Sequence, residues 1–261
     1  MNNNYAHRAL IVGLMSLALA ILPGCATKQP GEPLKTHASA SDSASSDNKD
    51  PFEFINRGLF SIHEVIDGLI LKPVAHIYRG VVPQPAQTGI KNALTNMASP
   101  VTLLNSALQG DVNNAGRTIG RFVINSTVGI AGIFDVASDM GIKKQHKKDF
   151  GQTLGVYGVG TGPYIFIPVL GPSDARDTVG LVADLFSDPF TYILTTPENL
   201  VYLGIDGVVK RTDLLPLTDR VSRDSLDPYA TYRSMYLQHR ESAVRDYLKH
   251  DTAGLQKETR N

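Results

Sequence analysis

The sequence predicts an all-α body that follows a short apolar leader and a polar tether. Apolar residues recur every three or four positions along most of residues 50–250, which is the period of an amphipathic helix. Capping residues followed by proline, and single glycines, divide this pattern into many short helices. Only residues 164–169 show the composition of a strand. We therefore expect helices packed on helices, with little or no sheet.

The leader has the organisation of a secretory signal, which we assign to residues 1–24. A cationic start containing Arg8 precedes an apolar run too short to span a membrane, and the run ends at Cys25, the only cysteine. The segment from Leu22 to Cys25 resembles a lipobox, although Pro23 replaces the usual small residue. We expect Cys25 to carry acyl chains such as palmitate, and Ala26 indicates an outer-membrane address. An ordinary signal with an incidental cysteine is the alternative.

Composition divides the rest of the chain into a linker, a body and a tail. Residues 25–49 are rich in Ser, Ala, Asp and Pro, and predict a flexible, disordered tether. Residues 50–250 form the helical domain, and residues 251–261 a disordered tail. Because an exported chain without a cysteine pair lacks a disulfide framework, its fold must come from core burial. The net charge of zero gives no indication of nucleic-acid binding.

The first helices are predicted from periodicity and punctuation. One apolar face runs through residues 52–70, and a second pattern begins at Pro85 and includes Ala86, Ile90, Ala93, Leu94 and Met97. Ser99 before Pro100 predicts the next start, Gly110 its end, and Asp111 the cap of the helix that follows.

Residues 119–137 carry the strongest apolar signal. The segment is amphipathic at first and then apolar on nearly all sides, which predicts burial in a protein core or in lipid. It is too short to span a bilayer alone, and Gly129 and Gly132 allow a sharp reversal or close packing. The sequence does not decide between a protein core and lipid, although a lipid anchor favours lipid.

Three further starts follow the same rules. We expect Ser173 to cap a helix over residues 174–186. Thr196 before Pro197 and Asp227 before Pro228 repeat the cap-then-proline device.

The segment from Gly155 to Tyr164 holds several glycines between Tyr157 and Tyr164. A phosphate loop would need a helix directly after the glycines, whereas Pro163 and a β-branched run follow. The chain also lacks a Gly-Lys-Ser/Thr sequence. The segment is therefore more typical of close backbone approach or of a smooth passage, with tyrosines at a wet–dry boundary.

No catalytic pattern is present in the sequence. It contains neither a Gly-x-Ser-x-Gly elbow nor a His-Glu-x-x-His motif, and its histidines lack metal-ligand spacing. We predict a protein that is not an enzyme and that holds no cofactor or metal. The basic run over residues 143–148 is a solvated loop or a contact to anionic lipid headgroups.

Motifs spread in order over residues 50–240 resemble the MlaA (VacJ) lipoprotein family. They include Asp50-Pro-Phe-Glu53 with Asn56-Arg57, Val82-Pro-Gln-Pro-Ala86, Leu108-Gln-Gly-Asp111, Arg121-Phe122 with Asn125-Ser126-Thr127, Asp135-Val-Ala137, Phe150–Gly155, Arg176-Asp177, Asp227-Pro-Tyr229 and Tyr236–Arg240. The chain departs from the family in lacking tryptophan, in Thr161 between the last glycines, and in its long tether.

The resemblance implies a ring-shaped body embedded in the inner leaflet of the outer membrane, on the periplasmic side. A channel through the ring would pass phospholipids that have strayed into the outer leaflet to a periplasmic carrier of the MlaC type. The resemblance also implies a trimeric porin partner of the OmpC/OmpF type. The matching positions give the expected channel residues: Arg121, Phe122, Asn125, Tyr157, Gly158, Gly160, Gly162 and Tyr164.

For each of these residues, the alternative to a place in the channel is a role in packing the fold. For the whole protein, the rivals are a lipid-anchored scaffold that binds envelope partners without passing lipid, and a hydrolase of misplaced lipids.

Overall fold

The structure is a computed structural model that describes the backbone of residues 50–258 and the side chains of residues 50–245. The expected signal, Cys25, the tether and residues 259–261 lie outside the described residues. The chain divides into two units, Met1–Ala44 and Ser45–Asn261, and the second contains everything reported below.

The first half of this unit is a chain of consecutive helices, with bounds α2 Glu53–Ile66, η1 Asp67–Leu71, α3 Lys72–Val81, α4 Gln84–Met97, α5 Ser99–Gln109 and α6 Val112–Thr127. In η1 the helix widens to a π turn at Asp67. The Arg211 guanidinium donates to both carboxylate oxygens of Asp67, at 2.5 and 2.7 Å. The first helical segment thus continues past the expected residue 70 as far as Val81.

The second half contains the hairpin and the two longest helices, with bounds α7 Val136–Asp139, α8 Phe150–Val156, β1 Tyr164–Ile167, β2 Gly171–Asp174, α9 Ala175–Ser187, α10 Phe190–Ile193, α11 Thr196–Asp224 and α12 Pro228–Glu258. The backbone of α12 continues past His250 to Glu258. The fold class is confirmed as all-α, with one small hairpin.

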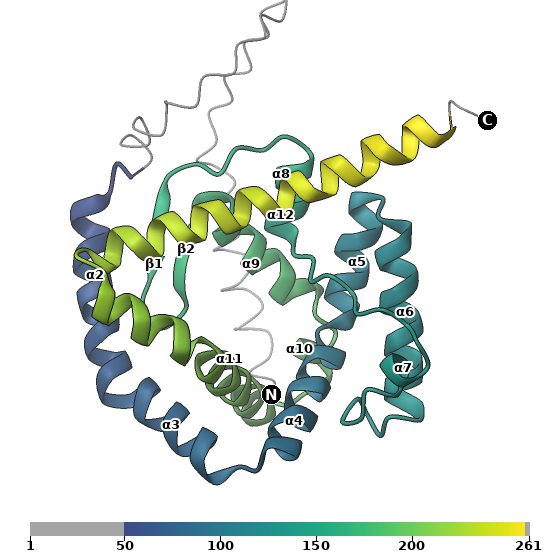
Figure 1. Ribbon diagram of the computed structural model, residues 1–261, viewed down its shortest axis with the longest axis horizontal. Coiled ribbons are helices and arrows are strands. Elements are labelled where there is room, and N and C mark those ends of the chain that lie inside the picture. The colour runs from purple at the N-terminus through teal and green to yellow at the C-terminus, as the bar shows by residue number, and fades with distance from the viewer. Residues whose placement is uncertain (1–49, 259–261) are drawn as a thin grey trace, which may run out of the picture. The chain divides into compact units, whose positions relative to one another are not determined.

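The helices follow one another around a ring (Figure 1). The ring closes because α11 packs against both α3 and α4, while α12 packs across α8, β2 and the end of α11. Elements far apart in sequence, such as α3 and α11, are therefore brought together. The ring shape agrees with the expectation from family resemblance.

A small core lies where the hairpin meets α2 and α12. Strands β1 and β2 pair antiparallel, with Tyr164 opposite Asp174. Tyr164, Phe166 and Tyr229 are buried together, and Leu59, Phe60 and Tyr236 pack on them. The Asn56 side chain fixes the hairpin on α2, since its amide donates to the Tyr164 carbonyl at 3.0 Å and its oxygen accepts from the Phe166 N–H at 3.0 Å.

Several predicted helix ends are confirmed. Gly110 ends α5 in the left-handed conformation at φ 77°. Asp111 accepts from the Asn114 N–H at 2.9 Å, and Asp227 from the Ala230 N–H at 3.1 Å, so both cap as expected.

Three predicted caps are wrong by one residue. Ser99 is the first helical residue of α5, and its hydroxyl donates back to the Thr95 carbonyl. Asp174, rather than Ser173, caps α9 by accepting from the Asp177 N–H at 2.7 Å. Thr195, rather than Thr196, precedes α11. In the last two pairs both neighbours are good capping residues, so local preference alone does not choose between them.

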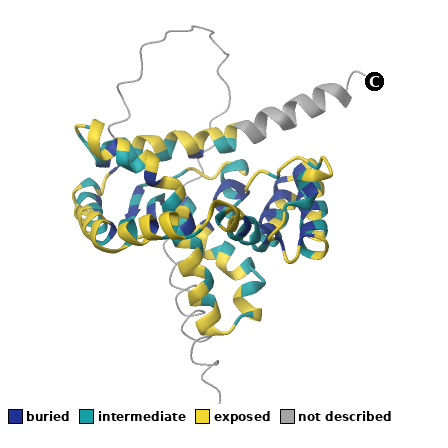
Figure 2. Cartoon of the chain, turned by 60° about the horizontal axis from the view of Figure 1, so that its bottom comes forward, coloured by how far each residue is buried: buried dark blue, intermediate teal, exposed yellow. Residues whose placement is uncertain are grey.

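Large apolar side chains are exposed at many positions of the described surface. Exposed residues of all kinds, yellow in Figure 2, lie along most of the helices. One stripe at helical spacing runs along α2, η1 and α3, with 41–75 % of each residue exposed; its members are Ile55, Ile62, Leu69, Ile70, Val74, Ile77 and Val81. Contiguous exposed apolar surface marks a site of contact with protein or membrane. Across the described part of the chain, each helix is too short or too polar to cross a bilayer.

Candidate functional site

An apolar groove of about 930 Å³ lies between α4, the α6–α7 loop and the α10–α11 segment. Its lining is Pro85, Ala86, Gly89, Ile90, Ala93, Leu94, Met97, Ile133, Phe134, Leu194, Pro197, Glu198, Val201, Tyr202 and Ile205. The α4 members are the apolar face that periodicity predicted. This volume lies near the upper end for small-molecule sites.

Polar groups are confined to one side of the groove. Glu198 is its only charged lining residue, and it accepts from the Thr195 N–H at 2.7 Å in the first turn of α11. Tyr202 follows one turn later. Burial, with the nearby charges of Asp188 and Asp206, raises the pKa of Tyr202 to about 12, so its hydroxyl stays neutral. The groove therefore suits an extended apolar ligand.

A sharp reversal after α6 supplies one wall of the groove. Ile130 and Ala131 have positive φ angles of 51° and 54°, and Gly132 follows at 90°. The Gly132 N–H donates to the Asn125 carbonyl at 2.7 Å, which turns the chain back on α6. Helix α6 ends at Thr127, and the chain reverses at the glycines, which is one of the two roles that the sequence left open for them.

The reversal places Ile133 and Phe134 beside α4. The Asn92 amide donates to the Ile133 carbonyl at 3.2 Å. Gly89 permits this approach, because a Cβ at that position would lie 3.1 Å from the Ile133 side chain. Ile133 and Phe134 remain 44 % and 57 % exposed, so the apolar segment borders the groove instead of filling a core.

A buried polar network supports the reversal from behind. Arg121 binds Asp135 at 2.6 Å, and its second nitrogen donates to the Ser138 hydroxyl and the Ile142 carbonyl, both at 3.0 Å. The Asn125 amide donates to Asp135 at 3.1 Å. Burial raises the pKa of Asp135, but the hydrogen bonds from Arg121, Ser138 and Asn125 outweigh burial and lower it to about 2. Arg121 is thus held in place as a structural cation.

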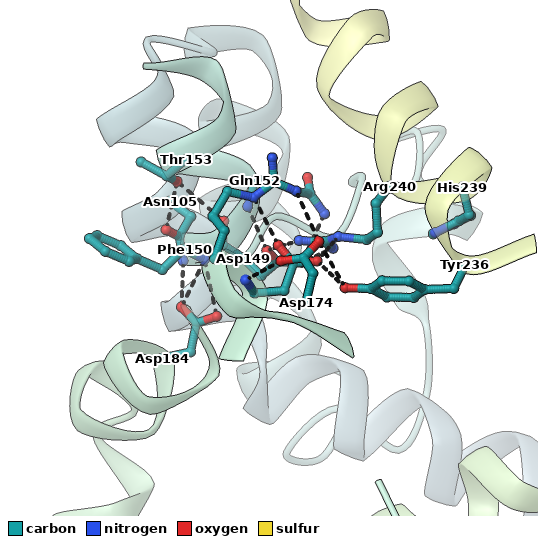
Figure 3. Close-up of polar contacts among 12 residues, drawn as sticks. Asn105, Asp149, Phe150, Gln152, Thr153, Asp174, Asp184, Tyr236, His239 and Arg240 are labelled. Atoms are coloured by element: carbon teal, nitrogen blue, oxygen red, sulfur yellow. Dashed lines mark hydrogen bonds and ion pairs between the residues drawn. The ribbon is translucent and has the colours of Figure 1, made fainter. Parts of the chain in front are cut away.

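A second network fastens α12 to α8 and α9 (Figure 3). Arg240 donates to both oxygens of Asp149 at 2.7 and 2.8 Å, and also forms an ion pair with Asp177. The Tyr236 hydroxyl donates to Asp177 at 2.5 Å. Burial raises the pKa of Asp149, but the hydrogen bonds and charge of Arg240 outweigh burial and leave it below its usual range.

Asp184 lies at the edge of the same region. Its carboxylate accepts from the Phe150 N–H at 3.1 Å and from the Asn105 amide at 2.9 Å. Burial raises the pKa of Asp184 to about 6 even though both hydrogen bonds act to lower it. The pKa of Asp184 thus lies closer to neutral pH than that of an ordinary aspartate.

The structure brings only some of the predicted channel residues together. Arg121 and Asn125 face a polar cavity of about 20 Å³ shared with α4, and Phe122 is half-buried on α6. Tyr157 is 68 % exposed and its hydroxyl donates to the Leu108 carbonyl at 2.7 Å. Gly158, Gly160 and Gly162 form an exposed loop between α8 and β1.

Tyr164 is only 1 % exposed, in the small core, where packing is its evident role. None of the eight predicted residues lines the apolar groove. The apolar face of α4 was the only signal in the sequence that could have indicated the groove. That face lines a groove only because α4 packs beside α11. Within residues 50–245, no cluster of three or more His, Cys, Asp or Glu side chains could hold a metal ion.

Fold and groove together define a class of all-helical proteins that present apolar side chains both on their outer surface and in a groove between helices. Residues 48–243 match the family model "MlaA lipoprotein". The chain therefore belongs to the MlaA lipoprotein family.

Relatives and a solved structure agree with this assignment. The chain is 34 % identical over 238 residues to the "Intermembrane phospholipid transport system lipoprotein MlaA" of Escherichia coli, covering 89 % of this chain and 88 % of that protein. The protein of the same name from Haemophilus influenzae is 32 % identical over 204 residues, covering 77 % and 81 %. A structure reported under "Structural basis for maintenance of bacterial outer membrane lipid asymmetry" aligns with TM-score 0.68 at 34 % identity, covering 75 % of this chain and 98 % of that one.

Proposed function

We propose that this protein removes mislocalised phospholipids from the outer leaflet of the outer membrane and passes them toward a periplasmic carrier. The movement maintains lipid asymmetry and makes or breaks no covalent bond. The names of the Escherichia coli and Haemophilus influenzae relatives, which describe phospholipid transport between membranes, support this assignment.

The groove between α4 and α11 is the observation that carries the proposal. Exposing an acyl chain to water costs roughly 0.8 kcal/mol for each CH₂ group. A groove lined by Ile90, Leu94, Val201 and similar residues removes that cost along part of the path. The headgroup would stay outside this apolar lining.

The exposed apolar stripe along α2 and α3 supports a position within one leaflet. Its side chains would meet acyl chains instead of water, which favours insertion of the ring without a spanning helix. Acylation of Cys25 would hold the body at the periplasmic side of the outer membrane.

Partners of two kinds fit this placement: a trimeric porin of the OmpC/OmpF type in the membrane, and a soluble lipid carrier of the MlaC type in the periplasm. Within the ring, the glycine loop from Tyr157 to Gly162 remains a candidate border of the lipid path. Gly160 has open space around its Cα, so it leaves a gap that a side chain would occupy.

The test fills the groove without disturbing the core. Ala93→Trp places a large side chain between α4 and α11, and Ala107→Trp on the exposed face of α5 is the matched control. Both variants are expressed in cells lacking the natural protein, and outer-leaflet phospholipid is measured by surface labelling. We expect phospholipid to accumulate with Ala93→Trp and to stay normal with Ala107→Trp at equal protein levels.

Three further readouts separate the rival functions. Normal asymmetry in the Ala93→Trp strain, with porin co-purification retained, would favour a scaffold over a lipid path. Lysophospholipid that depends on the protein would favour a hydrolase. Photo-crosslinking from position 90 should capture phospholipid in membranes, and failure there would count against passage through this groove.

A further inference from the structure

One wall of the groove belongs to a segment that contains no buried residue. Every residue from 181 to 208 is exposed or half-buried, and this is the longest such run between residues 50 and 245. It covers the end of α9, all of α10 and the first half of α11. We call residues 185–208 the arm. The arm contributes six residues to the groove lining: Leu194, Pro197, Glu198, Val201, Tyr202 and Ile205.

The chain on either side of the arm is fixed to the ring. Before the arm, Asp184 accepts hydrogen bonds from the Phe150 N–H and the Asn105 amide. After it, Val209 is the first buried residue of α11. Three ion pairs then join α11 to η1, α3 and α4: Arg211–Asp67, Lys72–Asp219 and Lys91–Asp213. The arm is thus a helical segment attached to the ring at its two ends.

The polar contacts of the arm are local. The Tyr192 hydroxyl donates to the Phe186 carbonyl at 2.9 Å, and the Asn199 amide donates to the Leu194 carbonyl at 3.2 Å. Among the described residues, each hydrogen bond or ion pair of the arm has its partner between residues 181 and 212. The arm can therefore move away from α4 and the α6–α7 loop without breaking a polar contact to either.

Two glycines lie where the arm joins the fixed part of α11. Gly204 and Gly207 are exposed, and a Cβ on either would meet no atom within 4 Å. They therefore serve no close packing, unlike Gly89, and neither has the positive φ angle that favours glycine. Glycine weakens a helix because it gains the most conformational freedom when the helix opens. The two positions are thus a weak point of α11 directly before buried Val209.

The opposite wall of the groove is held more firmly. The Asn92 amide on α4 donates to the Ile133 carbonyl, and the buried ion pair of Arg121 and Asp135 supports the reversal that carries Ile133. Segments with few buried contacts and exposed backbone hydrogen bonds open locally at the lowest cost in free energy. The arm has these features, so the groove combines one fixed wall with one wall that can move.

We propose that the arm is a gate that moves about Gly204 and Gly207 and opens the groove to the acyl chains of a phospholipid. The proposal rests on the proposed function, because it assigns the moving part of that lipid path. As the arm moves away from α4, acyl chains enter the groove from the side. When the arm returns, Val201 and Ile205 cover the chains, and this burial of apolar surface stabilises the closed position.

The test stiffens the hinge and leaves the groove lining unchanged. The double variant Gly204→Ala/Gly207→Ala adds two methyl groups in open space, so it should fold normally. Gly116→Ala, at an exposed glycine within α6 with the same open surroundings, is the matched control. The full acylated protein in detergent micelles is mixed with micelles containing photoactivatable phosphatidylethanolamine, and capture is measured at successive times. Hydrogen exchange is measured on the same proteins before lipid is added.

Two rates should change together. In the natural chain, the amides of residues 198–208 should exchange faster than those of residues 211–221. The double variant should slow both exchange in the arm and phospholipid capture by about fivefold or more, because each alanine stabilises the closed helix. The amount captured at long times should stay constant. Gly116→Ala should change neither rate.

Several outcomes would overturn the gate. Equal exchange in the two parts of α11 of the natural chain would show that the arm is held as firmly as the ring. Slower exchange in the double variant with an unchanged capture rate would mean that the arm does not control entry, and would leave the proposed function standing. Equal slowing of capture by Gly116→Ala would trace the effect to general stability. If the natural chain captures no phospholipid, the gate and the lipid path through this groove are both wrong.

Discussion

Arg121 on α6 and Asp135 at the start of α7 form an ion pair of 2.6 Å whose side chains are only 6 % and 18 % exposed. The pair spans the reversal that carries Ile133 and Phe134 to the groove. This buried ion pair therefore supports both the stability of the fold and the position of the two residues that line the groove.

Removing one partner of this pair should destabilise the fold strongly. Arg121→Met leaves a buried carboxylate without its cation, and we expect a loss of about 3–5 kcal/mol in the free energy of unfolding. Urea denaturation in detergent measures it. Glu241→Gln, which breaks an exposed pair with Arg245 on α12, should change stability by less than about 0.5 kcal/mol. Equal losses in the two variants would contradict the assigned role.

The same pair predicts an acid-dependent stability. Because the folded pKa of Asp135 is lowered to about 2, its stabilising contribution is complete above the unfolded value near pH 4. That contribution should disappear as the pH falls from 4 toward 2. Asp135→Asn should be less stable at pH 7 and should lose less stability over this interval. Denaturation curves recorded at several pH values test the difference, and parallel profiles for the two chains would refute it.

Asp184 should make stability depend on pH in the direction opposite to Asp135. Its folded pKa of about 6 lies above the unfolded value, so the folded state binds the proton more tightly. Stability contributed by this group is present below pH 4 and is lost as the pH rises through 6. In Asp184→Asn, the free energy of unfolding should depend less on pH over this interval and should be higher at pH 7. A variant that is less stable than the natural chain at pH 7 would show that the carboxylate itself is needed.

Arg240 predicts how firmly α12 is held. Arg240→Lys keeps the charge but cannot form the paired bonds to Asp149 while also reaching Asp177. We expect a loss of about 2 kcal/mol, and faster hydrogen exchange in α8. Lys210→Arg, an exposed substitution of the same kind on α11, is the control. Unchanged exchange in α8 would mean that other contacts hold α12.

Gly132 predicts a steric requirement at the reversal. At φ 90° a β-branched residue is strained, and an added Cβ would overlap the Asn96 side chain. Gly132→Val should cost at least about 1–3 kcal/mol and displace Ile133 from the groove. Gly116→Ala, within α6 and with open space around it, should instead stabilise by about 0.5–1 kcal/mol. Thermal unfolding of both variants checks the contrast.

The sequence by itself determined the helical class and some of its boundaries. These depend on neighbours within one turn: Gly110 and Asp111 end and start helices through local bonds, and the apolar face of α4 is visible as a period. Where two capping residues are adjacent, as at Ser173 and Asp174, the choice needed the surrounding fold. The motifs that follow one another over residues 50–240 also sufficed to indicate the family.

Only the tertiary structure decided what the apolar faces meet. Periodicity shows that a face is apolar, but a core, a groove and an exterior all present the same pattern. Ile90 faces the groove because α4 packs beside α11, more than a hundred residues later, whereas Tyr164 enters the core because Asn56 fixes its strand on α2.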